Sequence, residues 1–250
     1  MPAKGSEILG FTSLPTSSMG GFFMFDAIRD ALLAEGRWEG YYQLTNLGSF
    51  VVLVLGISVF LIITGLLFKR TKISTWVLTY AGLSLAVAFV LSYFRIFPMP
   101  MGGSVTPMSM FFVAFIGFLF GPSIGLVSGL SYGLLQFAQG PMVLHPFQLF
   151  LDYPLAFGML GFSGFFYKAK GGLYIGYIAA VTGRFIMHVI SGYFFFGHYA
   201  SEGTHPLWYS IAYNAGYIYA EAAVTLVIIA IPTVRHALFH VKSRVAARAV

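Results

Sequence analysis

The sequence has no cysteine in its 250 residues, and it carries very little charge. Without cysteine, a disulfide framework, a thiolate metal site and a cysteine nucleophile are all excluded. Aspartate, glutamate, lysine and arginine together make up 9% of the chain, whereas 58% of the residues are hydrophobic and 18% are aromatic. Because a soluble domain carries about 25% charged residues, this composition indicates a polytopic membrane protein.

Signatures of enzymatic chemistry are also missing. The sequence contains no H-E-x-x-H metal motif, no Walker loop and no dinucleotide fingerprint, so we expect neither a metal nor a cofactor. The segment GLSYG, residues 129–133, matches the G-x-S-x-G elbow of serine hydrolases, but that elbow needs a strand-turn-helix setting. Here the motif lies within a predicted membrane helix, where small residues usually permit close packing. We therefore expect that the protein is not an enzyme; a hydrolase that uses Ser131 and His188 is the alternative from another class.

Hydropathy predicts the number of membrane spans. A spanning helix needs roughly 20 mostly apolar residues, and this criterion predicts an all-α membrane protein with seven spans. They lie near residues 48–68, 75–97, 108–121, 122–139, 146–167, 173–197 and 208–234. The third and fourth are short and separated only by Gly121 and Pro122, so we expect either a tight hairpin or a tilted pair that neighbours partly bury.

The basic residues predict the orientation in the membrane, because positively charged loops stay on the cytoplasmic side. The net charge of +6 arises largely from clusters beside apolar segments, so we expect no nucleic-acid partner. The loops 98–107, 140–145 and 198–207 contain no lysine or arginine. These loops should face outward, with the N-terminus outside and the C-terminus in the cytoplasm. The basic clusters follow the first, fifth and seventh spans: Lys69, Arg70 and Lys72; Lys168 and Lys170; Arg235, Lys242, Arg244 and Arg248.

The two ends of the chain differ from its middle. Residues 1–45 form an N-terminal extension in which residues 21–36, GFFMFDAIRDALLAEG, have the apolar spacing of an amphipathic helix. Such a helix would lie at the outer membrane surface; the alternative is a poorly ordered extension. Residues 235–250 form a basic cytoplasmic tail. No cleavable signal peptide is recognisable, so we expect the first span to act as the insertion signal.

Ionisable residues within membrane spans are rare and are functional candidates by default. The stretch LFLDYPLAFG, residues 149–158, places Asp152 in an apolar run two residues before Pro154. Arg184 and His188 are four residues apart and share one helical face, so Asp152 could pair with either. Two interpretations remain open: a structural ion pair, or a carboxylate that balances the charge of a cationic ligand. For the fourth candidate, Glu221, we expect a backbone or tyrosine hydroxyl partner.

Aromatic residues gather around the last outward loop, in YFFFGHYASEGTHPLWYSIAYNAGYIY, residues 193–219. An aromatic belt at the membrane interface explains Tyr199 and Trp208, but it does not explain Asn214, which must find hydrogen-bond partners inside a span. Aromatic faces with a few polar groups are typical of a ligand pocket. Tyr209, Asn214 and His188 are suitable for one.

Several of these segments together resemble one family. GGSVTPMSM, SYGLLQF, LFLDYPLAFG, the R-x-x-x-H of Arg184 and His188, and the later FFGHYASEG, WYS and YN elements are similar to the thiamine-specific substrate-binding subunit, or S component, of energy-coupling factor (ECF) transporters. The resemblance covers residues 75–234. It implies a six-helix vitamin-binding domain, residues 71–234, preceded by an additional transmembrane helix, residues 46–70. It also implies a plasma-membrane location and three partner chains: one transmembrane scaffold subunit and two ATP-hydrolysing subunits.

The same resemblance implies which residues hold thiamine. Asp152 and Tyr153 match an acidic-tyrosine pair in which glutamate is the commoner acid, and Phe196 stands where tryptophan is common. FPMPMGG lacks the tryptophan that often covers the ligand. Asp152 would neutralise the thiazolium cation, while the aminopyrimidine would stack on an aromatic ring and accept or donate hydrogen bonds. The implied ligand-binding residues are Asp152, Tyr153, His188, Phe196, Tyr209 and Asn214.

The departures from the family pattern leave alternatives for ligand and energy source. A shorter acid and a smaller ring are compatible with an S component for another vitamin or for a thiamine precursor, such as a related pyrimidine or thiazole compound. A proton-coupled thiamine carrier that works alone is a further alternative. Family members contact the scaffold through small residues spaced by four on the first core helix. The corresponding pairs here are Gly82 with Ala86 and Ser84 with Ala88, a spacing that is common in membrane helices.

Overall fold

The structure, a computed structural model, describes residues 26–35, 42–45, 47–48, 50–51, 54–55, 58, 62, 66 and 73–248. Residues 26–32 are helical, and strand β1 (Leu33–Glu35) then pairs antiparallel with β2 (Tyr42–Leu44). The predicted amphipathic helix of residues 21–36 is therefore wrong at residues 33–35, which form a strand, and its residues 21–25 and 36 lie outside the described residues. The described positions between 47 and 66 are helical, and the remainder of that predicted span lies outside the described residues.

Six helical segments follow. They are α3 (Thr75–Tyr93), α4 (Ser109–Phe120), α5 (Pro122–Gln136), a composite segment from α6 (Pro146–Phe150) to η4 (Met159–Phe166), α8 (Gly172–Phe195) and α9 (Pro206–Ala230). The composite segment also contains the π-helical turn η3 (Leu151–Leu155) and α7 (Ala156–Gly158). Among the described residues, four helices are long and apolar enough to cross a membrane: Thr75–Tyr93, Phe147–Phe166, Gly172–Phe195 and Pro206–Ala230. The prediction of an all-α membrane protein is confirmed.

The short helix α4 lies inside the bundle. Twelve residues extend only about 18 Å at 1.5 Å per residue, which is less than the roughly 30 Å of a bilayer core. Most of its side chains are buried, including Phe111, Ile116 and Phe118, and it contacts α3, α5, α8 and η4. Gly121, with φ of 91°, then turns the chain directly into α5. The short third and fourth spans are thus a tightly connected helix pair, of which neighbouring helices bury α4 and partly bury α5.

Close backbone contact joins α5 to the composite segment. A Cβ atom on Gly161 would lie 2.2 Å from the backbone carbonyl carbon of Gly125, so neither position has room for a side chain. The serine motif lies on the same helix. Ser131 donates a hydrogen bond from Oγ to the carbonyl of Val127, 2.8 Å away within α5, and this regular helix is not a nucleophile elbow.

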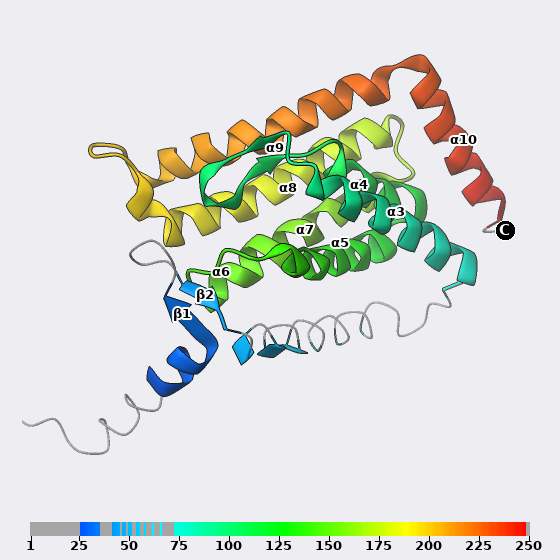
Figure 1. The fold of residues 1–250 in the computed structure, drawn as a ribbon. Helices are drawn as coiled ribbons and strands as arrows, with labels where there is room; N and C mark the ends of the chain where they lie inside the picture. The colour runs from blue at the N-terminus through cyan, green and yellow to red at the C-terminus, as the bar shows by residue number, and fades with distance from the viewer. Residues whose placement is uncertain are drawn as a thin grey trace, which may run out of the picture.

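Two of the predicted spans end earlier than their hydropathy indicates. The span predicted to residue 97 ends at Tyr93, because the chain turns into a hairpin in which β3 (Phe97–Pro98) pairs with β4 (Ser104–Val105). The last span ends at Ala230, and α10 (Pro232–Arg248) leaves it at an angle (Figure 1). Pro232 starts α10 without loss of a hydrogen bond, since the first helical position has no N–H partner.

Lys242 fastens α10 to the bundle. Its Nζ donates to the backbone carbonyls of Tyr167, at 2.6 Å, and of Phe118, and it lies 3.7 Å from the centre of the Phe118 ring. Burial lowers the pKa of Lys242 to about 8. The predicted basic tail is therefore a helix whose lysine is partly withdrawn from solvent.

The two small-residue pairs on α3 have different surroundings. Gly82 and Ala86 are exposed on the outer surface of the bundle. Ser84, in contrast, donates a hydrogen bond to the carbonyl of Phe112 at 2.8 Å, and Ala88 is fully buried. Packing within the chain therefore buries Ala88 and engages the Ser84 hydroxyl, which leaves Gly82 and Ala86 as the more accessible of the two predicted pairs.

Candidate ligand-binding site

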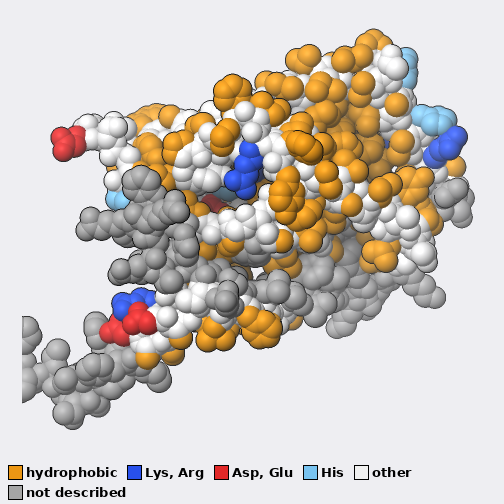
Figure 2. Space-filling view, viewed as in Figure 1, with side chains coloured by type: hydrophobic (Ala, Val, Ile, Leu, Met, Phe, Trp, Pro, Cys, Tyr) orange, Lys and Arg blue, Asp and Glu red, His pale blue; other side chains and the backbone are white. Residues whose placement is uncertain are grey.

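A cavity of about 170 Å³ lies between α3, α5, α6 to α7, α8, α9 and the β3–β4 hairpin. This volume is far above the roughly 15 Å³ that one water molecule requires, so the cavity has room for a ligand of several atoms. Figure 2 shows a hollow in a mostly hydrophobic face, with basic atoms at its rim and acidic atoms deeper inside. All six predicted ligand residues line this cavity: Asp152, Tyr153, His188, Phe196, Tyr209 and Asn214.

Asp152 lies in the π-helical turn of the composite segment. Pro154 has no N–H to continue the α-helical ladder, and the helix widens at this point. Gln148, one turn earlier, donates from Nε2 to Asp152 Oδ2 at 2.6 Å. The side chain of Asp152 is 12% exposed, so the carboxylate is held near the cavity with little contact to solvent.

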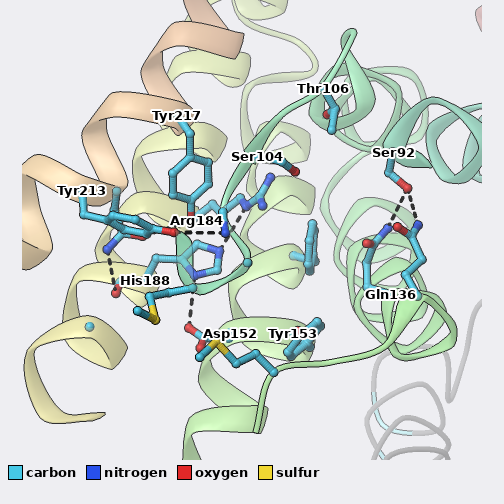
Figure 3. A pocket seen from close by; sticks show the side chains of 18 of the residues that line it. Ser92, Ser104, Thr106, Gln136, Asp152, Tyr153, Arg184, His188, Tyr213 and Tyr217 are labelled. Carbon is cyan, nitrogen blue, oxygen red and sulfur yellow. Dashed lines mark hydrogen bonds and ion pairs between the residues drawn. The ribbon is translucent and has the colours of Figure 1, made fainter. Parts of the chain in front are cut away.

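His188 joins Asp152 to Arg184. Its Nδ1 lies 3.1 Å from Asp152 Oδ1, and its Nε2 lies 3.3 Å from Arg184 Nε. Because Arg184 can only donate, Nε2 must accept, which assigns the ring hydrogen to Nδ1 and makes His188 a neutral donor toward Asp152. The direct ion pair between Asp152 and Arg184 that we considered is replaced by a chain through the imidazole, whose members appear in Figure 3.

A column of side chains on α9 forms one wall. Tyr209, Tyr213, Tyr217 and Glu221 are spaced by four residues, share one helical face and all line the cavity. The rings of Tyr209 and Tyr213 are stacked with centroids 6.0 Å apart. Tyr213 accepts a hydrogen bond from the N–H of Gly103 at 3.1 Å and donates to the carbonyl of Pro100. Tyr213 therefore holds the tip of the β3–β4 hairpin over the cavity.

Asn214 has found its hydrogen-bond partners within the chain. Its Nδ2 donates to the carbonyls of Ser210 at 2.9 Å and His188 at 3.3 Å, and its Oδ1 accepts from the hydroxyl of Tyr217 at 3.0 Å. These contacts tie α9 to α8. Asn214 thus lies at the cavity wall with both amide atoms already engaged.

Glu221 is the most deeply buried carboxylate of the site, with 3% exposure. It accepts from the backbone N–H groups of Thr106 at 3.0 Å and Met110 at 3.1 Å, and from the hydroxyls of Thr106 at 2.6 Å and Ser109 at 3.3 Å. The first N–H groups of a helix have no partner within it, so Glu221 satisfies the start of α4 from another helix. The prediction of a backbone partner is confirmed.

A second polar cluster, on the α3 and α5 side of the cavity, was missed from sequence. Gln136 and Gln139 each donate an amide N–H to Ser92 Oγ, at 3.2 and 2.5 Å. Arg95, just beyond the end of α3, also lines the cavity and is exposed. Arg95 lies within the predicted span 75–97. The rule that ionisable residues within spans are functional candidates, which identified Asp152, therefore applies to Arg95 as well.

In the described part of the chain, no three histidine, aspartate or glutamate side chains come together as a metal site. Phe196 ends α8 and lies tilted against Tyr199 with centroids 6.3 Å apart. Apolar helices around a cavity lined by aromatic and polar groups define a multi-pass membrane protein with an internal cavity of a kind that suits a small molecule.

Comparison with known proteins identifies the family. The family described as Thiamine transporter protein (Thia_YuaJ) matches residues 78–240. The Thiamine transporter ThiT of Bacillus subtilis (strain 168) is 40% identical over 146 residues, which cover 52% of this chain and 75% of that protein. The ThiT of Lacticaseibacillus paracasei is 31% identical over 120 residues, 43% of this chain and 60% of that protein. The chain belongs to the thiamine transporter protein family.

A solved structure supports the same assignment. ThiT from Listeria monocytogenes is 28% identical, has a TM-score of 0.55, and covers 62% of this chain and 91% of its own. The resemblance to thiamine-specific S components is confirmed by these relatives. Since the family consists of transporters, the expectation of a protein without enzymatic activity is confirmed as well.

Proposed function

We propose that this chain binds thiamine in the cavity and is the S component of an ECF-type importer. One observation carries the proposal: the six residues that the family resemblance assigns to thiamine come from three separate helical segments, yet they line one cavity. Residues far apart in sequence would not converge in this way if the resemblance reflected hydrophobic composition alone.

The chemistry of the cavity suits a cationic aromatic ligand. The thiazolium ring of thiamine has a permanent positive charge, and among the described residues each oxygen of Asp152 accepts one hydrogen bond. A carboxylate has about four acceptor positions, so two remain for the ligand. The faces of Phe196 and Tyr209 are suitable for stacking on its rings. Because the amide of Asn214 is already engaged, we expect it to position His188 and Tyr217 more than to contact the ligand.

The orientation supports capture from outside the cell. The cavity is lined by Gly102, Gly103 and Gly140, which belong to loops that carry no lysine or arginine. The basic helix α10 follows the end of α9, and the basic loop that holds Lys168 follows the end of the composite segment. In both spans this end is the one opposite to the cavity. We infer a plasma-membrane protein that opens its cavity outward, with the N-terminus outside and the C-terminus in the cytoplasm.

Partner subunits would supply the energy. The sequence has no nucleotide-binding motif, so we propose that a transmembrane scaffold and two ATP-hydrolysing subunits drive uptake. Gly82 and Ala86 are the exposed small residues on α3 where a scaffold helix could approach closely. In liposomes, this chain alone should bind thiamine but not accumulate it under a pH gradient; accumulation would instead show a stand-alone proton-coupled carrier.

Isothermal titration of the purified chain tests the binding proposal. We expect one thiamine per chain, and Asp152→Asn should weaken binding about 100-fold, since a hydrogen bond or contact to a charged group contributes about 1.5–3 kcal/mol. The matched control is Asp30→Asn, because Asp30 is exposed and is not among the residues that line the cavity. Unchanged affinity in Asp152→Asn would remove its role as counter-charge. A ligand panel in a thermal-shift assay would reveal a related pyrimidine or thiazole as the true ligand.

A further inference from the structure

A buried glutamine, Gln148, contacts the carboxylate of the site. Gln148 is 1% exposed and lines the cavity one helical turn before Asp152. Buried polar side chains are nearly always hydrogen-bonded, whereas an apolar side chain of the same size would fill this place without a need for partners. The partners of the amide therefore indicate its role.

Three hydrogen bonds fix the orientation of the Gln148 amide. Its Oε1 accepts from the backbone N–H of Leu144 at 3.0 Å, and its Nε2 donates to the carbonyl of Met142 at 3.1 Å and to Asp152 Oδ2 at 2.6 Å. A backbone N–H can only donate, and a backbone carbonyl can only accept. Rotation of the amide by 180° would place its oxygen against two acceptors, so the hydrogens of Nε2 are held toward Met142 and Asp152.

The loop that holds this amide is itself anchored in the bundle. Within residues 140–145, Val143 lies between the two backbone partners of the amide and is fully buried. His145, the last residue of the loop, stacks its ring on that of Phe195 in α8, with centroids 5.2 Å apart. The amide is therefore held by a backbone that has little freedom to move.

Asp152 is held by neutral groups on two sides. Gln148 donates to its Oδ2, and His188, a neutral donor, lies 3.1 Å from its Oδ1. These donors come from two helical segments, so the carboxylate cannot turn about its Cβ–Cγ bond without loss of one of them. Because neither donor is charged, neither cancels the negative charge as a directly bound arginine or lysine would. The two contacts fix the position of the charge and leave it available to a ligand.

We propose that Gln148 is a positioning residue, which holds the Asp152 carboxylate where it meets the positive charge of the bound vitamin. The inference rests on the proposed function, because it concerns how that ligand is held. A misplaced carboxylate loses its interaction with a charged ring, whereas the contacts that other residues make to the rest of the ligand remain. Loss of Gln148 therefore weakens the binding of a cationic ligand more than that of a neutral ligand of the same shape.

Isothermal titration with thiamine and with an analogue in which a neutral thiophene ring replaces the thiazolium ring tests this role. Gln148→Met keeps the length of the side chain but has no donor. It should weaken thiamine binding about tenfold or more and change binding of the neutral analogue less than about threefold. The matched control is Gln136→Met, at a glutamine that lines the cavity but donates to Ser92. This control should leave the ratio of the two affinities unchanged.

A double-mutant cycle distinguishes positioning from support of the loop. If Gln148 acts through Asp152, Gln148→Met should change thiamine binding less than about threefold in a chain that already carries Asp152→Asn. A glutamine that only supports residues 140–145 would weaken binding equally in both backgrounds, and that result overturns the inference. Equal loss of both ligands in Gln148→Met, or an unchanged affinity for thiamine, overturns it as well.

The outcomes separate this inference from the function on which it rests. Thiamine binding to the unaltered chain without a selective effect of Gln148→Met overturns only the positioning role, whereas binding of neither compound overturns the proposed function too. Thermal unfolding shows whether each variant is folded. Where Gln148→Met does not fold, Gln148→Asn replaces it, because its amide is one methylene shorter and does not reach all three partners. The same selective loss of thiamine binding is expected, and its absence overturns the positioning role.

Discussion

Glu221→Gln is the substitution that most directly tests how α9 supports α4. The variant keeps the size and shape of the side chain but replaces one carboxylate oxygen with an amide that donates. All four groups that now contact Glu221 are donors toward it, including the backbone N–H groups of Thr106 and Met110. Two donors would then face each other in a buried place.

The expected loss follows from these contacts. Glutamine can still accept at one oxygen, so at least one backbone N–H, that of Thr106 or Met110, loses its acceptor. An unsatisfied buried group costs about 1–3 kcal/mol, and removal of a negative charge from the start of a helix costs about 0.5–1 kcal/mol more. The sum is about 2–4 kcal/mol. A domain of this size shifts its unfolding temperature by about 2–4 °C per kcal/mol, so we expect a decrease of roughly 10 °C.

Thermal unfolding of the purified protein in detergent, followed by intrinsic fluorescence, measures this decrease. The control is Glu202→Gln, the same substitution at an exposed position, which should unfold with the unaltered chain. If Glu221→Gln unfolded at the temperature of Glu202→Gln, the hydrogen bonds to α4 would contribute no net stability, and the reasoning would be refuted.

Three further predictions concern the packing around the site. Gly161→Ala should lower the unfolding temperature or prevent folding, because its Cβ would meet backbone at 2.2 Å, whereas Gly216→Ala has open space and should be neutral; equal unfolding temperatures would contradict this. Tyr213→Phe removes both hydrogen bonds to the β3–β4 hairpin, so ligand dissociation in stopped-flow measurements should become about five- to tenfold faster; an unchanged rate would contradict the contact. Folding lowers the pKa of Lys242 to about 8. Above pH 8 the unfolded chain therefore binds more protons than the folded chain, and stability rises with pH in that range. We expect the docking of α10 to strengthen between pH 8 and 10. Hydrogen exchange in α10 measures this strengthening, and Lys242→Met should abolish it.

Much of the fold could be predicted because the bilayer imposes length and polarity on a spanning helix. The segments from α3 to α9 follow the predicted spans, and Asp152, His188 and Glu221 were recognised since ionisable groups are costly in lipid. The end of α3 was not predictable from hydropathy, because the run after Tyr93 is apolar apart from Arg95, while its prolines favour a hairpin. The hydropathy of an apolar residue is the same in a helix and in a strand, so a hydropathy average does not distinguish the two.

The cavity wall on α9 could have been predicted from a spacing pattern in the sequence. Spacing by four from Tyr209 reaches Tyr213, Tyr217 and Glu221, and this pattern alone places them on one face. The partners of Asn214 could not be predicted in the same way. Two of them are backbone carbonyls, and their positions depend on how α8 and α9 pack rather than on any residue type.

The π-helical turn around Asp152 affects how the direction of Asp152 depends on the position of Gly161 in the same span. An α-helix rotates about 100° per residue, so a strictly regular helix would fix the direction of Asp152 from the direction of Gly161. Gly161 has no freedom, because it is in close contact with α5. A π-helical turn holds about one residue more than an α-helical turn, which changes the angular relation between Asp152 and Gly161. Substitutions of the Asp152 side chain can therefore alter ligand specificity without disturbing the contact between Gly161 and Gly125.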